Sequence, residues 1–364
     1  MNLKDLINKQ EELHKDLVPY LGNFKVFTCL KHPLVFGIPY SKEMNAIYNE
    51  QYKYKKEAVD KAFKSKNWGS YLFLHERPYR LSQFLNIKDK LSNQDYGKYL
   101  AEIWIDSENL WQFNFILEKL VNHPGSKFMM DDKDKELYNK LPEEFVIHRG
   151  HQSKNKKGYS WTLSYWRAKW FANRFQDKNN NVSSALVKKE DICAVLKGRG
   201  ELEIVVSPNK VKFLRQQTIK RPEWMNEILN DINLFGYHGI WHWEKVEKNA
   251  LTLAKNNKAD KTVVQLFALI HDSQRLNENE DPEHGQRAAD FVKELFNQDK
   301  LNISTNQLEK LIIACKDHEK GFISEDVTIG TCWDADRLDL TRVGIIPEKK
   351  YLSTQAAKDL LWKI

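Results

Sequence analysis

The C-terminal part of the chain carries histidines and aspartates in an order that could hold a divalent metal ion. His242 opens a helical pattern, and the adjacent pair His271 and Asp272 follows the apolar run VVQLFALI. An acidic stretch, CWDADRLDL, comes later in the chain. Imidazoles and carboxylates are the ligands that divalent metals use where a bound water must remain. Because such a metal lowers the pKa of its bound water and can neutralise a phosphate, the pattern predicts a divalent metal site.

Seven residues of this pattern could serve as metal ligands, and within the acidic stretch both Asp334 and Asp336 remain open. Ligand chemistry alone does not distinguish Mn, Fe, Co, Ni, Zn and Mg as the divalent metal. The candidate metal ligands are His242, His271, Asp272, Asp336, Asp334, His284 and His318. Three basic side chains could contact the phosphate, although each is equally well explained as a surface salt-bridge partner: Arg275, Arg287 and Lys245.

This part of the sequence resembles the HD superfamily of metal-dependent phosphohydrolases. The resemblance covers about residues 224–364 and is carried by HGIWHWEKVEKNA, FALIHDSQR, DPEHGQRAA and WDADRLDLTRVG. It implies an all-helical domain in which His242 is the first ligand and Asp336 is the last. His271 and Asp272 correspond to the paired ligands, and Asp334 is the close competitor of Asp336. His284 and His318 resemble the additional histidines of two-metal members, and a one-metal site in which either of them touches phosphate fits equally well. The resemblance implies a phosphomonoester or phosphodiester substrate, such as a nucleotide, without choosing between them.

A second group of residues could bind NAD. Between about residues 140 and 208 the chain contains FVIHRGH, then GYSWTLS, then GELEIVV, with strand-like patterns at 144–147 and 201–206. An arginine can hold a pyrophosphate through bidentate hydrogen bonds. A glutamate that accepts a hydrogen bond from a ribose 2′-hydroxyl would stabilise an oxocarbenium-like transition state as nicotinamide leaves. Glu201 and Glu203 are two residues apart, so on one strand they would face the same side.

The order of these residues resembles the arginine–serine–glutamate class of ADP-ribosyltransferases. The resemblance implies that Arg149 holds the NAD phosphates and that Ser160 supports the site. It makes Glu203 the catalytic glutamate and Glu201 the upstream member of the pair, which positions or deprotonates the acceptor. Thr162 stands where a second serine is commoner, and it retains the hydroxyl. The residues expected to bind NAD are Arg149, Gly150, Ser160, Trp161 and Thr162. For the tryptophan of this set, burial in the core is an equally good explanation.

The elements expected to position these residues indicate an α+β region followed by an all-α region. Residues 1–140 alternate helical patterns, at 44–63 and 99–121, with extended, proline-bearing pieces. Beyond residue 224 the apolar spacing is almost wholly helical. The helices are expected at 225–234, 242–255, 262–271, 286–296, 306–314 and 354–363.

We therefore expect an α+β N-terminal domain, with an ADP-ribosyltransferase-like split sheet and helices, followed by an all-α HD-type helical domain. The expected boundaries are 1–140 for a helical and extended part of the first domain, 141–220 for the transferase-like core and 221–364 for the helical domain. The role of residues 1–140 is left open, and so is the oligomeric state.

The composition is that of a globular protein. With 364 residues the chain is long enough for two domains, and 41% hydrophobic and 29% charged residues argue against disorder. No stretch reaches the roughly 18 to 20 apolar residues of a membrane span, and the N-terminus has an amphipathic pattern rather than that of a signal peptide. We therefore expect a cytoplasmic protein without a membrane partner. Four cysteines without CxxC spacing argue against a zinc knuckle or a disulfide scaffold.

The main hypothesis is a bifunctional, nucleotide-related enzyme. Its N-terminal domain would transfer ADP-ribose from NAD to an unknown acceptor, which could be a protein, a nucleic acid or a small molecule. Its C-terminal domain would hydrolyse a phosphate ester with a divalent metal. Two alternatives remain open: an HD phosphohydrolase regulated by a non-catalytic NAD- or nucleotide-binding module, and a toxin- or effector-type ADP-ribosyltransferase. The net charge of +7 is mild for this length and does not by itself establish a nucleic-acid partner.

Overall fold

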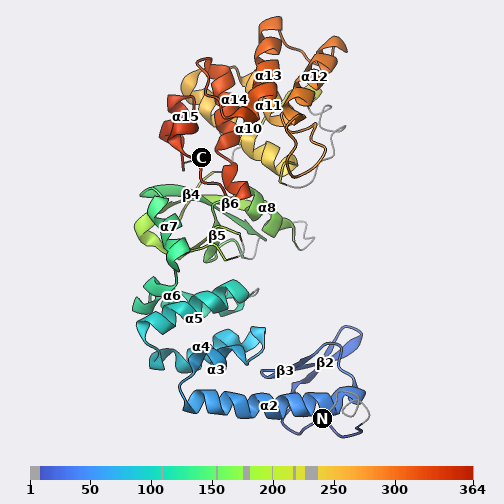
Figure 1. Cartoon of the computed structure of the whole chain (residues 1–364), viewed down its shortest axis with the longest axis vertical. Helices are drawn as coiled ribbons and strands as arrows, with labels where there is room; N and C mark the ends of the chain where they lie inside the picture. The colour runs from blue at the N-terminus through green and yellow to red at the C-terminus, as the bar shows by residue number, and fades with distance from the viewer. Residues whose placement is uncertain are drawn as a thin grey trace. The chain divides into compact units, whose positions relative to one another are not determined.

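The computed structural model describes residues 9–107, 110–152, 155–174, 181–198, 200–215, 219–225 and 237–363. The described chain is a mixed α/β structure with two antiparallel sheets and a helical C-terminal region (Figure 1). The chain divides into two compact units, Met1–Asp131 and Asp132–Ile364. All residues expected to do chemistry belong to the second unit.

The first unit combines a small sheet with short helices. Its strands β1 (Leu21–Phe24), β2 (Phe27–His32) and β3 (Val35–Gly37) pair antiparallel in chain order. Its helices are α2 (Asn45–Lys64), α3 (Trp68–Phe73), α4 (Arg80–Ile87), α5 (Asn93–Asp106) and α6 (Asn114–Val121). The helix predicted at 44–63 is confirmed by α2. The one predicted at 99–121 is wrong as a single helix, because α5 ends at Asp106 and a 3₁₀ turn at Leu110–Phe113 precedes α6.

The second unit begins with α7 and a sheet of six described strands, all paired antiparallel in the order β7-β8-β5-β4-β6-β9. The elements are α7 (Asp132–Lys140), β4 (Glu144–His151), β5 (Ser160–Thr162), α8 (Tyr165–Asn173), β6 (Asn181–Lys188), β7 (Ile192–Leu196), β8 (Glu203–Val206) and β9 (Lys212–Phe213). The sheet is nearly divided in two. β4 pairs with β6 along its whole length, whereas β4 and β5 share only the pair His148 and Thr162.

Helix α8 lies very close to β4 at Gly150. A Cβ atom at this position would stand 1.9 Å from the backbone oxygen of Ala168. Such an approach is possible only for glycine, since side-chain atoms cannot overlap backbone atoms. Ala168 and Ala172, both buried, present small side chains on the helix. Gly150 therefore has a packing role in addition to its place in the Arg-Gly motif.

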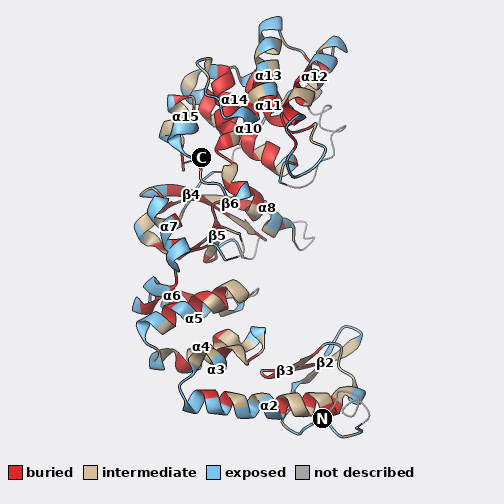
Figure 2. Ribbon diagram, viewed as in Figure 1, coloured by how far each residue is buried: buried red, intermediate tan, exposed pale blue. Residues whose placement is uncertain are grey.

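The C-terminal part of the second unit is helical. It contains α10 (Ile240–Asn257), α11 (Lys261–Ile270), α12 (His284–Asn297), α13 (Thr305–Asp317), α14 (Val327–Arg337) and α15 (Gln355–Leu360). Every residue of α11 from Val263 to Ile270 is buried, and the Asp260 side chain caps the start of this helix. Figure 2 shows buried residues concentrated along α10, α11 and α14. The core of these helices thus fixes the end of α11, from which the His-Asp pair emerges.

Most of the helices expected in this part of the chain are present, with ends that differ by a few residues from the expected ones. The helix expected at 225–234 lies almost entirely outside the described residues. The acidic stretch that carries Asp334 and Asp336 is not a loop but part of α14, a helix that the sequence analysis did not anticipate. Its chain of Thr, Gly, Cys, Trp and Asp residues lacks a clear amphipathic pattern, because the helix is buried on almost every side.

The sheet and the helical part contact each other directly within the second unit. The Nζ of Lys248 on α10 donates to the Tyr165 hydroxyl on α8 at 2.7 Å, and the Thr341 hydroxyl donates to the Leu163 carbonyl at 3.1 Å. This division into units differs from the boundaries expected at residues 140 and 220. At the first boundary the physical reason is clear: the Asp134 carboxylate of α7 accepts a hydrogen bond from the Lys197 amide, at the end of β7.

Candidate functional site

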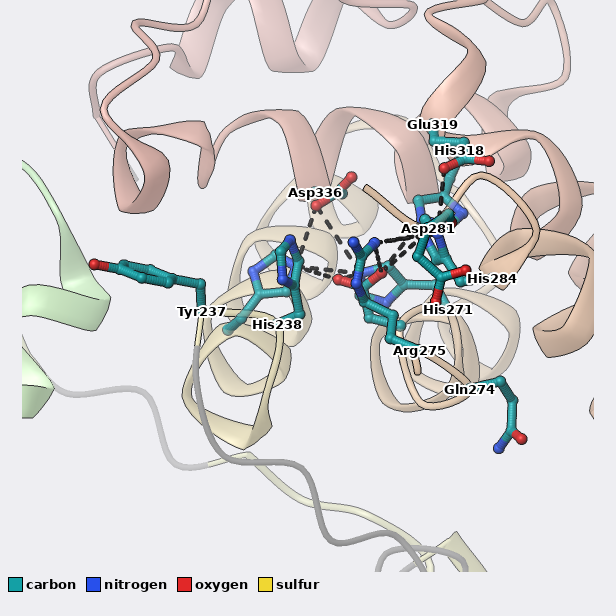
Figure 3. A network of polar contacts seen from close by, with 12 residues as sticks. Tyr237, His238, His271, Gln274, Arg275, Asp281, His284, His318, Glu319 and Asp336 are labelled. Carbon is teal, nitrogen blue, oxygen red and sulfur yellow. Dashed lines mark hydrogen bonds and ion pairs between the residues drawn. The ribbon is translucent and has the colours of Figure 1, made fainter. Parts of the chain in front are cut away.

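Four buried histidines from separate elements of the helical part converge on one point. His242 lies in the first turn of α10, and His271 directly follows α11. His284 is the first residue of α12, and His318 opens the 3₁₀ turn after α13. Figure 3 shows the side chains of His271, His284 and His318 gathered close together, with Asp336 of α14 at one side of the group. Positions at helix ends leave these side chains free to turn toward a shared centre.

Each of the four imidazoles is held through its Nδ1 atom. The acceptor is a backbone carbonyl in three cases and a carboxylate in the fourth. The pairs are His242 with Asp339 Oδ2 at 2.8 Å, His271 with Phe267 O at 3.1 Å, His318 with Cys315 O at 2.7 Å, and His284 with Asp281 O. Because these oxygens accept, each Nδ1 carries the proton, and the neutral ring then presents the lone pair of Nε2. Such outer partners are what orient metal-binding histidines in proteins.

The Nε2 atoms face one another in two pairs. Those of His242 and His271 lie 3.1 Å apart, and those of His284 and His318 lie 3.0 Å apart. Asp272 joins the pairs: its Oδ2 lies 3.6 Å and 3.5 Å from the first two Nε2 atoms, and its Oδ1 lies 3.1 Å and 3.5 Å from the second two. One carboxylate therefore contacts both halves of the cluster.

Asp336 completes the first half. Its Oδ1 lies 3.2 Å from His242 Nε2 and 3.9 Å from His271 Nε2, and it has no hydrogen bond of acceptable geometry to any described residue. The Asp336 side chain is 13% exposed, whereas the other five cluster side chains are at most 4% exposed. The cluster is therefore buried on most sides and opens at Asp336.

These six side chains fit divalent metal ions. Two nitrogens bound to one ion at about 2.0 to 2.1 Å would lie roughly 2.9 to 3.4 Å apart in octahedral or tetrahedral geometry, which matches both imidazole pairs. Two unprotonated Nε2 atoms at this distance repel each other unless a proton or a cation lies between them. The buried Asp336 oxygen without an acceptable hydrogen bond is a further donor atom that an ion would satisfy. The donor set suits two ions that share Asp272.

Three members of the cluster have protonation states that suit metal binding. For His242 and His318, by contrast, the neighbouring aspartates outweigh burial and raise the pKa. Burial lowers the pKa of His271 to about 3, so this imidazole is neutral at physiological pH. Burial by itself would raise the pKa of Asp272, but His271, His284 and His318 hold that pKa well below its usual range. The pKa of Asp336 is likewise lowered, since His242 and Arg342 outweigh the effect of burial. Neutral imidazole and ionised carboxylate are the forms that bind metals.

Asp334 is not part of the cluster, although the sequence analysis included it as a competitor of Asp336. Its two oxygens accept hydrogen bonds from the amides of Ser353 and Thr354 and from the Thr354 hydroxyl. Positions 334 and 336 are separated by about 200° around a helix of 3.6 residues per turn. The two carboxylates of α14 therefore point in opposite directions, and Asp334 stabilises the start of α15.

The basic residues considered for phosphate binding have different surroundings. Arg287 is paired with Asp281 at 2.6 Å and donates to the Gln274 carbonyl, so it has a structural role. Arg275 lies at the cluster, with Nη1 3.7 Å from Asp272 Oδ1. Lys245 turns toward the sheet, where its Nζ lies 5.7 Å from the centre of the Tyr165 ring. Only Arg275 of the three is placed where a phosphate bound at the cluster could reach it.

Lys245 yields a test of this packing through the pH dependence of stability. Burial lowers its pKa from 10.5 to about 8, against the attraction of Asp339. Between these two values the unfolded chain binds more protons than the folded one, so the free energy of unfolding should rise with pH in this window. A Lys245→Met variant should lose this rise. The stability of this variant relative to wild type should then fall by up to about 3 kcal/mol from about pH 7 to about pH 10.5.

Urea unfolding at about pH 7, 8.5 and 10 measures this difference across the window between the two pKa values. An exposed lysine of the same part of the chain, changed in Lys293→Met, should give a pH dependence parallel to that of wild type. Parallel curves for the Lys245 variant as well would contradict the buried, partly discharged state of this side chain.

The three motifs of the candidate NAD site lie on adjacent strands. Arg149 is on β4, Ser160 is on β5 and Glu203 is the first residue of β8, and β5 lies between the other two. Arg149 is partly buried, and its Nη1 donates to the Ser160 carbonyl at 2.6 Å while Nη2 donates to the Asn155 carbonyl at 3.2 Å. Burial lowers the pKa of Arg149 to about 10, with Glu203 acting in the opposite direction. The guanidinium therefore stays charged at neutral pH.

The residues of β5 have mainly structural contacts. Trp161 is buried, and its Nε1 donates to the Gly158 carbonyl at 2.9 Å. The Thr162 hydroxyl donates to the Glu201 carbonyl at 2.6 Å, and in the sheet Thr162 lies opposite Glu203. Of the two explanations for Trp161, core packing is the one that fits its burial. Thr162 links the glutamate segment to the strand that bears the serine.

The Glu-x-Glu pair does not lie on one continuous strand. β8 begins at Glu203, and Leu202 has a φ of +46°, in the left-handed region. The expectation that Glu201 and Glu203 face the same side rested on an uninterrupted extended backbone, so this argument was wrong. Glu201 lies in the turn that precedes β8. Its backbone carbonyl, which accepts from the Thr162 hydroxyl, is its contact with β5.

Two residues that contact the histidine–aspartate cluster were missed as site residues by the sequence analysis. Asp339 lies in the same acidic stretch and fixes the Nδ1 of His242, and Arg342 lies 3.7 Å from Asp336. The sequence indicated only part of this. It shows that Asp339 lies three positions after Asp336, but it does not show that Asp339 accepts a hydrogen bond from His242, 97 residues earlier in the chain.

None of the helices in the described ranges has both the length and the apolar character needed to span a membrane. Comparison of the chain with known protein families, with curated proteins and with solved structures finds no match.

Proposed function

We propose that the helical part of the chain is a metal-dependent phosphoester hydrolase with a two-ion centre. One observation carries the proposal: four imidazoles anchored through Nδ1 direct their Nε2 atoms, in two pairs about 3 Å apart, toward the carboxylate of Asp272. The resemblance of the sequence to the HD superfamily also supports the proposal. Six of the seven residues expected as metal ligands lie together in the cluster. The substrate in this proposal is a phosphate ester.

Each residue has a distinct task in this proposal. Asp272 would be shared by both ions, and Asp336 would bind the first ion on the open side of the cluster. Asp339 holds His242 in the tautomer that presents Nε2. When bound, divalent ions lower the pKa of a coordinated water and neutralise the charge of the phosphate. The buried walls exclude other water from the reacting centre.

Metal removal tests the proposal directly. Purified protein should contain close to two equivalents of divalent metal by element analysis and should release phosphate from at least one member of a nucleotide and phosphoester panel. Treatment with a chelator should abolish phosphate release, and addition of Mn, Fe or Co should restore it. Protein without metal after reconstitution, or with activity that survives chelation, would argue against a metal-dependent hydrolase.

We further propose that the sheet of the second unit binds NAD and transfers ADP-ribose. The observation that favours it is the placement of Arg149, Ser160 and Glu203 on three neighbouring strands, β4, β5 and β8, at the place where the sheet is split. The sequence resemblance to arginine–serine–glutamate ADP-ribosyltransferases is a second, independent support. The acceptor would be a protein, a nucleic acid or a small molecule. A sheet that binds NAD without cleaving it, and so regulates the hydrolase, is the competing explanation.

Together these proposals describe a bifunctional enzyme that acts on nucleotides. No disulfide joins the described cysteines, three of which are buried. This suits a reducing compartment, and a cytoplasmic location is part of the proposal.

A further inference from the structure

Arg342 stands at the open side of the metal cluster with an unused donor group. The residue lies in the 3₁₀ turn Leu340–Val343, and its side chain is 6% exposed. Its Nε donates to the Tyr237 carbonyl at 3.0 Å. Its Nη1 lies 3.7 Å from Asp336 Oδ1, and its Nη2 lies 4.0 Å from Asp272 Oδ2. The buried Nη1 has no hydrogen-bond partner among the described residues.

A buried guanidinium nitrogen without a partner is costly unless something else accepts from it. Leaving such a donor unsatisfied costs more than an ordinary hydrogen bond gains, because the group has lost its contact with water. The Nε of Arg342 nevertheless anchors the side chain. Its Nη1 is thereby fixed near Asp336, the most exposed side chain of the cluster. The position is suited to a ligand that enters at Asp336 and carries acceptor oxygens.

Arg275 lies at the second half of the cluster. Its Nη1 lies 3.7 Å from Asp272 Oδ1 and 3.1 Å from both ring nitrogens of His284, and its Nη2 donates to the Asn279 carbonyl. Figure 3 shows this guanidinium pointing into the group of imidazoles. One arginine is thus fixed near each oxygen of the shared carboxylate, Arg275 near Oδ1 and Arg342 near Oδ2.

The charges of these groups favour a ligand with two negative charges. The carboxylates of Asp272, Asp336, Asp339 and Glu319 carry four negative charges, and the guanidinium groups of Arg275 and Arg342 carry two positive charges. Two divalent ions held by the cluster would therefore leave a net charge of +2, which a dianion would neutralise. The terminal phosphate of a monoester carries between about 1.5 and 2 negative charges at neutral pH, whereas a diester carries only one. Arginine is also the side chain whose fork best matches phosphate oxygens.

We propose that Arg342, together with Arg275, binds the terminal phosphate of a phosphomonoester dianion at the metal centre. This inference rests on the proposed hydrolase function and narrows its substrate class. The two arginines contact the non-bridging oxygens of the phosphate, and the opening at Asp336 admits the rest of the ester. Arg287 takes no part, because Asp281 already occupies its guanidinium.

Calorimetric binding of two simple anions to the manganese-loaded full chain tests this assignment. Inorganic phosphate represents the dianion and dimethyl phosphate represents the diester monoanion. Wild type should bind inorganic phosphate at least about tenfold more tightly than dimethyl phosphate. Arg342→Gln should retain its manganese and lose phosphate affinity by about 10- to 100-fold, as expected for a charge-assisted hydrogen bond. Arg342→Lys should keep part of the affinity, and the exposed Lys293→Gln control should match wild type.

The outcomes separate the inference from the function on which it rests. Wild-type protein that takes up no manganese would remove the metal centre and this inference together. Retained manganese with unchanged phosphate affinity in Arg342→Gln would overturn the inference alone, and so would equal affinity of wild type for both anions. Loss of manganese in this variant would show that Arg342 only supports the metal ligands. If Arg342→Gln does not fold, Arg275→Gln provides the same comparison from the other side of Asp272.

Discussion

An Asp272→Asn variant is expected to lose metal from both halves of the cluster and to lose phosphoester hydrolysis by about a thousandfold or more. The reason is that Oδ1 and Oδ2 of this single carboxylate contact different imidazole pairs. An amide keeps the size of the side chain but removes its negative charge and replaces one acceptor oxygen by a donor. Element analysis of the purified variant and phosphate release from the best wild-type substrate measure the two losses.

Asp334 provides the matched control on the neighbouring carboxylate of the acidic stretch. Asp334→Asn should retain the full metal content, because both of its oxygens are bonded to Ser353 and Thr354 rather than directed at the cluster. It should instead lower the melting temperature, because the new amide NH₂ group would face the N–H and O–H donors that now bond to the carboxylate. Wild-type metal content in Asp272→Asn, or loss of metal in Asp334→Asn with an unchanged melting temperature, would contradict the assignment of the two aspartates.

A Glu203→Gln variant is expected to release nicotinamide from NAD about 100- to 1000-fold more slowly than wild type, because a carboxylate that accepts from the ribose hydroxyl stabilises the positive charge that develops as nicotinamide leaves. A neutral amide does so far less. Glu203 lies at the start of β8, opposite Thr162, so the substitution leaves the backbone pairing of the strand in place. Nicotinamide release and transfer of label from NAD into co-purified protein or RNA are the measurements.

Glu190, an exposed residue of the 3₁₀ turn between β6 and β7, is the control of the same residue type. Glu190→Gln should release nicotinamide like wild type. Undiminished release by Glu203→Gln would refute the role of this glutamate. Wild-type protein that binds NAD without any release of nicotinamide would refute the transferase proposal as a whole and favour a regulatory module.

The sequence was a better guide to which residues lie together in the cluster than to how each of their side chains is oriented. Helices such as α11 could be predicted because they have a cap at Asp260 and an unbroken apolar run, and the His-Asp pair follows from their end. The choice between Asp334 and Asp336 depended on recognising α14 as a helix. Its nearly complete burial removes the amphipathic spacing by which helices are predicted.

The misjudged features depend on tertiary contacts or on unusual backbone angles. Leu202 adopts a φ of +46°, which its residue type does not suggest, and this alone invalidated the same-face argument for the two glutamates. The partner of His242 is 97 positions away at Asp339, and the sequence contains no local indication of this pair.

The contacts between α8 and α10 limit how freely the two halves of the second unit can change during evolution. The Lys248 ammonium and the Tyr165 hydroxyl satisfy each other across this boundary, as do Glu244 and Lys169. A chain that retained only one half would expose these partners and the apolar surface around them. Selection for either of the two proposed activities would therefore preserve residues of the opposite half. A lineage without one of these activities would still be expected to keep the fold of the corresponding half.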